Sequence, residues 1–203
     1  MGKYKVEIAA KSIVYQGFFR LEKYRLRHSL FEGGMSDLMS RELFERGHAV
    51  AILPYDPIRD EVVLLEQFRI GAINDPDGAW LTEIVAGMFG KDETAKEVAK
   101  REAVEEAGCD ITEFAHICNY YVSPGGTSET IALYCGKVDS SKVVEGVYGL
   151  DEEHEDIRVF KSSYQELVAC FELGKINSAA PIIAIQWLMM NRDNMRKVWR
   201  LIK

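Results

Sequence analysis

The sequence predicts an α/β fold of the α+β kind, a sandwich on a mixed sheet with a small antiparallel β region in front of it. Two observations lead to this fold class. Apolar runs of strand length lie before and after one amphipathic helix, and two further helical segments follow them. With 203 residues, the chain is long enough for one good core and a small appendage. We expect the β region to span residues 1–46 and the larger domain residues 47–203.

The first segment, residues 3–45, alternates apolar and polar side chains in several runs. Such alternation is typical of short antiparallel strands, and residues 5–8 and 18–26 are two examples. Glu32-Gly33-Gly34 predicts a turn. A segment of this size does not support a core of its own, so we expect it to pack on the rest of the chain or on a second subunit.

From Gly47 onward the pattern changes to apolar runs of strand length. The predicted strands are residues 48–53, 61–68, 80–86, 116–122, 130–138 and 157–160, with a hairpin loop at residues 56–60. The predicted helices are residues 95–107, 164–173 and 181 to about 202. Pro181 suits the first turn of the last helix. Its expected core residues are Ile183, Ile185, Leu188 and Met189. The basic residues that complement its dipole are Arg192, Arg196, Lys197 and Arg200.

The predicted helix at residues 95–107 has well-defined ends. Thr94 and Glu97 form a capping box at its start. Gly108 fits the left-handed residue that ends a helix. Glu97 also stands four residues before Arg101, which is the favourable order for a surface ion pair.

One face of this helix joins apolar and acidic side chains. The stripe that starts at Ala95 has core-facing spacing and continues to Glu102 and Glu106, with Glu105 beside them. Unpaired carboxylates that face inward are costly, and like charges one turn apart repel. A hard divalent cation, Mg²⁺ or Mn²⁺, removes both costs. A solvated acidic helix face is the alternative.

The segment around this helix has a fixed pattern of residue types. It reads Gly87-x5-Glu93-x7-Arg101-Glu102-Ala103-x-Glu105-Glu106-x-Gly108-Cys109. This pattern resembles the Nudix box, the signature of hydrolases that cleave nucleoside diphosphates linked to another moiety. The resemblance implies a Nudix-type α/β/α sandwich with a mixed sheet, and a salt bridge between Glu93 and Arg101 that braces the loop. The implied metal ligands are Glu102, Glu106, Glu155 and the Ala86 carbonyl.

Residues 123–129, Ser-Pro-Gly-Gly-Thr-Ser-Glu, form a second informative segment. Pro124 lies sixteen residues after Gly108. In this respect the chain resembles the branch of the family that hydrolyses ADP-ribose, whose members have a proline at this distance. A Pro-Gly-Gly turn can bring backbone amides close to a ligand, and Glu129 can accept a hydrogen bond from a ribose hydroxyl. A plain hairpin turn is the alternative.

Residues 151–156 hold five acidic side chains in six positions. A run of this kind is usually a solvated loop. Glu153-His154-Glu155-Asp156 is similar to the Glu-x-Glu-Asp loop of the resembling enzymes. The resemblance implies that Glu153 is the general base and Glu155 a metal ligand, with Glu152 as the alternative base.

The resemblance also implies several side chains that bind the substrate. In the resembling enzymes an arginine at the place of Arg69 holds the diphosphate or ribose phosphate, and the fixed fork of donors suits that task. A structural salt bridge is the alternative for Arg69. Arg41 and Phe18 match positions that hold adenine, in the same or a partner subunit, and a core position is the alternative for Phe18. Met88 and Glu129 complete the substrate-binding set.

Composition limits the classes of function. The formal net charge of −7 argues against a general binder of nucleic acid or membrane surfaces. No apolar run has transmembrane length and no signal-peptide core follows the first residues, so we expect no membrane partner. We expect the widely spaced cysteines to be buried free thiols of a cytoplasmic protein. They are Cys109, Cys118, Cys135 and Cys170.

Together these motifs predict a Mg²⁺-dependent hydrolase that converts ADP-ribose and water to AMP and ribose 5-phosphate. We expect a homodimer with exchanged N-terminal β regions, because the resembling enzymes are dimers of this kind. Three alternatives are open: hydrolysis of another nucleoside diphosphate sugar such as GDP-mannose, a non-catalytic ADP-ribose sensor, and an acidic interaction module. The sensor predicts a broken box or an attached DNA-binding domain, whereas the box is intact.

Overall fold

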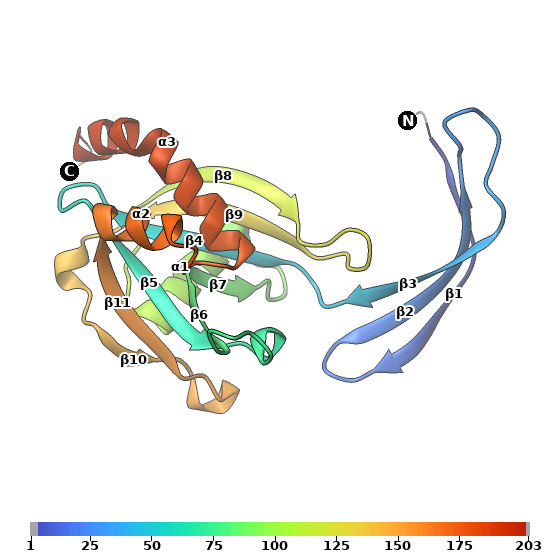
Figure 1. The fold of residues 1–203 in the computed structure, drawn as a ribbon, viewed down its shortest axis with the longest axis horizontal. Helices are drawn as coiled ribbons and strands as arrows, with labels where there is room; N and C mark the ends of the chain where they lie inside the picture. Colours follow the sequence, from blue (N-terminus) through green and yellow to red (C-terminus); the bar gives the residue numbers. More distant parts are fainter. Residues whose placement is uncertain (1–3, 202–203) are drawn as a thin grey trace. The chain divides into compact units, whose positions relative to one another are not determined.

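The computed structural model describes residues 4–201, with the exception of the side chain of Glu153. The chain separates into two compact units, which Figure 1 colours along the sequence. The first unit consists of the chain through His48 together with Tyr121–Thr130. The second consists of Ala49–Tyr120 and the chain from Ile131 onward.

The first unit contains a three-stranded antiparallel sheet in the order β1-β2-β3 (Figure 1). Its strands are β1 (Val6–Gln16), β2 (Arg20–His28) and β3 (Met39–Glu45). The predicted antiparallel strands are therefore confirmed, but β1 is longer than the short strand expected. Every residue of β1 is exposed to solvent.

A polar network replaces an apolar centre in this small sheet. Glu22 on β2 is buried, and its carboxylate accepts a hydrogen bond from the Tyr24 hydroxyl at 2.7 Å. It also pairs with Lys11 at 2.9 Å and Arg20 at 2.7 Å. The bond from Tyr24 and the two cations hold the pKa of Glu22 below its usual range. A buried carboxylate without such partners would destabilise the sheet.

The second unit is built on a mixed sheet in the order β10-β11-β5-β4-β9-β8. The strands are β4 (Ala49–Asp56), β5 (Glu61–Phe68), β8 (Glu113–Tyr121), β9 (Thr130–Lys137), β10 (Gly146–Tyr148) and β11 (Ile157–Ser163). β4 pairs parallel with β9 and antiparallel with β5, so the sheet is mixed as predicted. The three-residue β10 was not predicted, because so short a strand has no measurable alternation.

The single strand predicted at residues 80–86 is wrong: this segment forms β6 (Trp80–Glu83) and β7 (Val85–Met88). β6 pairs with β5, whereas β7 pairs with β4. The chain changes partner at Ile84, which is itself buried. The apolar pattern runs across this change without a break, so periodicity does not reveal it.

Helices cover both faces of the mixed sheet, which confirms the predicted sandwich. They are α1 (Ala95–Ala107), α2 (Tyr164–Glu172) and α3 (Ala179–Leu201), with short 3-10 turns η1 (Ile70–Ala72), η2 (Ser140–Lys142) and η3 (Asp151–Glu153). α1 shares one core with Val63 and Leu65 of β5. α2 and α3 share the other core with Val62 and Leu64 of the same strand. None of the described helices is long and apolar enough to span a membrane.

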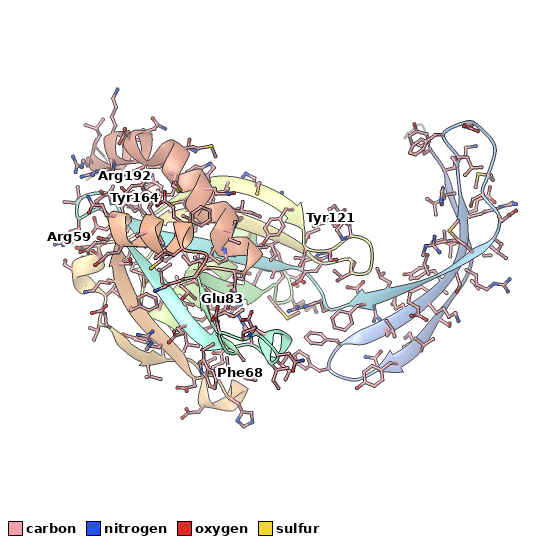
Figure 2. All side chains as sticks on the ribbon, viewed as in Figure 1. Arg59, Phe68, Glu83, Tyr121, Tyr164 and Arg192 are labelled. Atoms are coloured by element: carbon pink, nitrogen blue, oxygen red, sulfur yellow. The ribbon has the colours of Figure 1, made fainter. Side chains whose placement is uncertain are left out.

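The end of α3 differs from the prediction. Ile185 and Leu188 are buried as expected, but Met189 is exposed. Arg192 and Arg196 do not merely complement the helix dipole, because both form ion pairs with Asp60 in the β4–β5 loop. The Arg192 guanidinium also lies 4.3 Å from the centre of the Tyr164 ring, and Figure 2 shows the two side chains together. These contacts fix α3 over the sheet.

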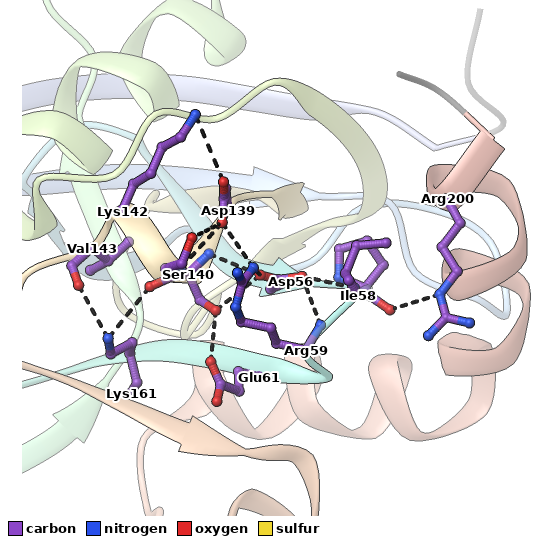
Figure 3. A network of polar contacts seen from close by, with 12 residues as sticks. Asp56, Ile58, Arg59, Glu61, Asp139, Ser140, Lys142, Val143, Lys161 and Arg200 are labelled. Carbon is purple, nitrogen blue, oxygen red and sulfur yellow. Dashed lines mark hydrogen bonds and ion pairs between the residues drawn. The ribbon is translucent and has the colours of Figure 1, made fainter.

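A second polar network closes the β4–β5 hairpin (Figure 3). The buried Asp56 carboxylate accepts hydrogen bonds from the amides of Ile58 (2.7 Å) and Arg59 (3.0 Å) and from the amide and hydroxyl of Ser140 (both 2.9 Å). Burial opposes the charged form, but these donors hold the pKa of Asp56 below its usual range. The hairpin predicted at residues 56–60 is confirmed.

The four cysteines are free thiols, as predicted. Cys109 and Cys135 are buried, whereas Cys118 and Cys170 are only partly buried. The expectation of burial therefore holds for two of them.

Candidate active site

The acidic helix α1 has the predicted boundaries. The Glu97 amide donates to the Thr94 hydroxyl at 3.4 Å, and the Thr94 amide donates to the Glu97 carboxylate at 2.8 Å. Gly108 ends the helix with φ of 57°, a left-handed conformation that glycine adopts without strain. Because the Glu97 carboxylate caps the helix start, the predicted Glu97–Arg101 pair is wrong.

Arg101 pairs instead with three other glutamates of the motif. Its Nε lies 3.1 Å from Glu93, and its Nη1 lies 2.8 Å from Glu102 and 2.9 Å from Glu105. The hydrogen bond to Glu93 contributes most to raising the pKa of Arg101. The second Glu93 oxygen accepts from the Gly90 amide at 2.8 Å. The predicted brace between Glu93 and Arg101 is therefore confirmed.

Glu106 is the most buried carboxylate of the helix, with 3% of its surface exposed. Its Oε2 accepts a hydrogen bond from the Ala86 amide of β7 at 3.0 Å. The pKa of Glu106 is raised to about 8, chiefly by burial. The charges of Glu102 and Glu155 also raise it, whereas the bond from Ala86 and the charge of Arg69 lower it. Within residues 4–201 its Oε1 has no hydrogen-bond partner. A positive partner would favour the charged form of this buried carboxyl.

Glu102 lies directly against the backbone of the loop that precedes α1. A Cβ atom built on Gly87 would lie 1.8 Å from Oε1 of Glu102, so only glycine leaves room for this carboxylate. Burial raises the pKa of Glu102, whereas the adjacent charge of Arg101 lowers it. The first fixed glycine of the motif thus has a direct steric role.

Glu155 approaches from the loop after η3. Its Oε2 accepts a hydrogen bond from the Leu150 amide at 3.1 Å, and its own amide donates to the Leu150 carbonyl at 3.2 Å. Gly149 has φ of 108°, and a Cβ there would lie 2.5 Å from that of Glu155. The side chain of Glu153, the expected base, lies outside the described part of the structure.

The donor set around Glu106 fits a hard cation. Glu102, Glu106 and Glu155 influence one another's charge, and all their donors are oxygen, which Mg²⁺ and Mn²⁺ prefer. In the described part of the chain these side chains do not converge as a complete metal centre. Glu102 is engaged by Arg101 and Glu155 by Leu150. Each contact uses one oxygen of the carboxylate, so the other oxygen remains for a cation.

Two predicted substrate residues lie in the same unit as the acidic cluster. Arg69 follows β5, and its Nε donates to Glu83 at 2.8 Å, so the salt bridge considered as an alternative is present. Its charge nevertheless reaches Glu106, whose pKa it lowers. Met88 ends β7, two residues after Ala86, and is 42% exposed. Glu83 was missed by sequence reasoning, because nothing in the local pattern links it to an arginine fourteen positions earlier.

The other three predicted substrate residues, Arg41, Phe18 and Glu129, belong to the first unit. Arg41 on β3 is exposed, and its Nη1 donates to the Ser40 carbonyl at 2.9 Å. Phe18 is 90% exposed and its ring makes a T-shaped contact with that of Phe19, so the alternative that places it in a core is wrong.

Glu129 is buried at the end of the Pro-Gly-Gly segment. Its Oε1 lies 3.4 Å from Nε of Arg46. The turn before it is closed by the amides of Gly126 and Thr127, which both donate to the Ser123 carbonyl at 3.0 Å. The turn is thus present, and Glu129 has a cationic neighbour that the sequence did not identify.

A sequence model of the NUDIX domain matches residues 45–175 of this chain, a range that contains the whole loop–helix–loop described above. The chain belongs to the Nudix family. The ADP-ribose pyrophosphatase of Escherichia coli strain K12 is 46% identical to this Nudix chain over 198 residues, which cover 98% of the chain and 94% of that protein.

More distant Nudix relatives have other names. The GDP-mannose pyrophosphatase of Yersinia enterocolitica is 28% identical over 189 residues, which cover 92% of this chain and 96% of that protein. A crystal structure of an ADP compounds hydrolase aligns with a TM-score of 0.67 at 18% identity, over 92% of this chain and 96% of the other. That similarity supports the Nudix fold.

Proposed function

We propose that this Nudix protein hydrolyses the diphosphate of ADP-ribose to AMP and ribose 5-phosphate, with Mg²⁺ as its cation. The observation that carries the proposal is the group formed by the buried Glu106 and the half-buried Glu102 and Glu155, whose charges act on one another beside the Gly87 loop. Such a group suits a cation bound to a diphosphate. The relative named ADP-ribose pyrophosphatase is 46% identical, against 28% for the one named GDP-mannose pyrophosphatase, which favours ADP-ribose.

The cation would be held by Glu102, Glu106, Glu155 and the Ala86 carbonyl. In an antiparallel ladder the N–H and C=O of one residue point to the same side, and the Ala86 amide points to Glu106. Nudix hydrolases generally use a divalent metal ion. When bound, such an ion screens the diphosphate charge and lowers the pKa of a water molecule.

The remaining roles are proposed from the places of these residues in the sequence motifs. Glu153 would accept the proton of the attacking water, since it stands two residues before Glu155 in the same loop. Arg69 would bind the diphosphate, and Met88 would contact the substrate beside the Gly87 loop. The proposed contacts to the adenosine and ribose come from Phe18, Arg41 and Glu129.

We also propose that residues 1–46 are a dimerisation region and residues 47–203 the catalytic domain of a homodimer. Every residue of β1 is exposed, and five of its large apolar side chains are at least half exposed. They are Val6, Ile8, Ile13, Val14 and Tyr15. Exchange of this region with a second copy would cover them. The free cysteines support a cytoplasmic location.

Among common nucleoside diphosphate compounds, ADP-ribose should have the highest kcat/KM, by at least about tenfold over GDP-mannose, which corresponds to ~1.4 kcal/mol. The reason is the 46% identity to an ADP-ribose pyrophosphatase, together with the sixteen-residue spacing from Gly108 to Pro124 and the presence of Glu129 after the Pro-Gly-Gly turn. Steady-state rates with Mg²⁺ across both sugars and ATP measure this. A higher specificity constant for GDP-mannose or ATP would overturn the substrate assignment.

If the sites are shared between subunits, two inactive variants should complement each other. The Glu106→Gln chain lacks the proposed metal ligand, and the Arg41→Ala chain lacks the proposed adenine contact. Mixed by unfolding and refolding, they should regain about a quarter of native activity, because half the dimers are mixed and each holds one intact site. Sedimentation should give about twice the 23.0 kDa chain mass at micromolar concentration. No recovery in verified mixed dimers would refute the shared site.

A further inference from the structure

Arg69 is held by one edge of its guanidinium group while the other edge is free. Its Nε donates to Oε2 of Glu83 at 2.8 Å, and its backbone amide donates to the Ala79 carbonyl at 2.8 Å. Within residues 4–201, neither Nη1 nor Nη2 of Arg69 donates a hydrogen bond. The side chain is 44% exposed. The two terminal nitrogens of the fork are therefore available to an anion.

Glu83 is positioned for this contact by the sheet. It lies on β6 directly opposite Leu65 of β5, and opposed residues project on the same face. Leu65 packs in the core beneath α1, so Glu83 projects on the face that carries the acidic helix. Its side chain, labelled in Figure 2, is only 15% exposed. The buried Gln67 donates to the same Oε2 at 3.3 Å and fixes that oxygen further.

Arg69 lies within electrostatic reach of the acidic cluster. The charge of Arg69 acts on the buried Glu106, whose Oε2 in turn accepts from the Ala86 amide at 3.0 Å. An anion bound near that cluster would meet the free nitrogens of Arg69. A diphosphate is such an anion, and planar guanidinium donors recognise its oxygens in pairs.

We infer that Glu83 is a positioning residue that holds Arg69 by Nε and directs its terminal nitrogens at the substrate diphosphate. This inference rests on the proposed function, in which Arg69 binds the diphosphate. Glu83 itself does not touch the substrate. A lysine in place of Arg69 has no Nε edge for Glu83 to hold, so the pair requires arginine.

A positioning role and a purely electrostatic role of Glu83 predict opposite effects on anion binding. If Glu83 only neutralised Arg69, both Glu83→Ala and Glu83→Gln would strengthen anion binding. If Glu83 positions Arg69, Glu83→Ala weakens anion binding. Glu83→Gln keeps an acceptor oxygen for Nε of Arg69, so this variant retains most of the native affinity. A matched control is Glu66→Ala on β5, which removes a glutamate paired with Arg158 at 2.7 Å on the opposite face of the sheet.

The test measures KM and kcat for ADP-ribose with Mg²⁺, and the Kd for an ADP-ribose analogue whose bridging oxygen is replaced by methylene. Glu83→Ala should raise both KM and Kd about tenfold, because a misplaced charge-assisted contact costs at least ~1.4 kcal/mol. The kcat of Glu83→Ala should stay within about threefold of native, because the contact stabilises the bound substrate and the transition state equally. Glu83→Gln and Glu66→Ala should stay within about threefold of the native Kd, which is less than ~1 kcal/mol.

A double-mutant cycle separates action through Arg69 from general damage. In an Arg69→Ala background, Glu83→Ala should change Kd by less than about twofold, well under ~1 kcal/mol. A tenfold change there, or unchanged Kd in Glu83→Ala alone, overturns the inference while leaving the proposed function standing. A native protein that neither binds the analogue nor hydrolyses ADP-ribose removes the proposed function, and the role of Glu83 with it.

Discussion

Glu106→Gln should lower kcat by about 10³ or more, because a metal ligand at the centre of the cluster is worth several kcal/mol of transition-state stabilisation. Glu106 is the most buried carboxylate of α1 and feels the charges of both Glu102 and Glu155. The substitution keeps an oxygen for the Ala86 amide and removes only the charge. Initial rates at saturating ADP-ribose and Mg²⁺ measure the loss, and a decrease of tenfold or less would mean that Glu106 is not a principal ligand.

Thermal unfolding provides the control for this variant. Without divalent cations, Glu106→Gln should have a Tm equal to or above native, because an unpaired buried carboxylate is costly to ionise. Added Mg²⁺ should raise the Tm of the native protein and have a smaller effect on the variant. Exhaustive chelation should abolish native turnover. Full turnover in the chelator would contradict the metal-dependent chemistry.

Glu153→Gln should lower kcat by about 10²–10⁴, the usual contribution of a general base, with nearly unchanged KM. The motivation is the Glu-x-Glu-Asp loop, in which Glu155 is held against Leu150 at 3.1 Å and so fixes the end of the segment. The variant should lose kcat and keep its KM because the base removes a proton from water and does not bind the substrate. Steady-state kinetics at several substrate concentrations measure both parameters.

Glu152 is the matched control for the base, since it is adjacent, acidic and exposed. Glu152→Gln should retain most of the native kcat. If Glu152→Gln is inactive and Glu153→Gln is not, the base is assigned one residue too late.

The sequence was most informative where structure depends on near neighbours. The ends of α1 follow from the Thr94–Glu97 capping box and the left-handed Gly108, both within one helical turn of the residues they cap. The inward position of Glu106 follows from helical periodicity alone. The family pattern also predicts the sandwich and the Glu93–Arg101 brace, and the structure confirms both.

The errors concern partners that are distant in sequence. Arg192 was assigned to the helix dipole, but its partner Asp60 lies 132 residues earlier. The split of residues 80–86 depends on which strands flank Ile84, and periodicity does not record a change of partner. Arg69 and Glu83 meet only because β5 and β6 are paired. Such contacts are set by topology, so single-chain patterns do not reveal them.

The most direct test of the central claim is to identify the products of ADP-ribose after incubation with the protein and Mg²⁺. The account predicts AMP and ribose 5-phosphate in equal amounts by chromatography, and neither product from the Glu106→Gln variant at the same time point. Intact ADP-ribose, or cleavage outside the diphosphate to give ADP, would contradict it.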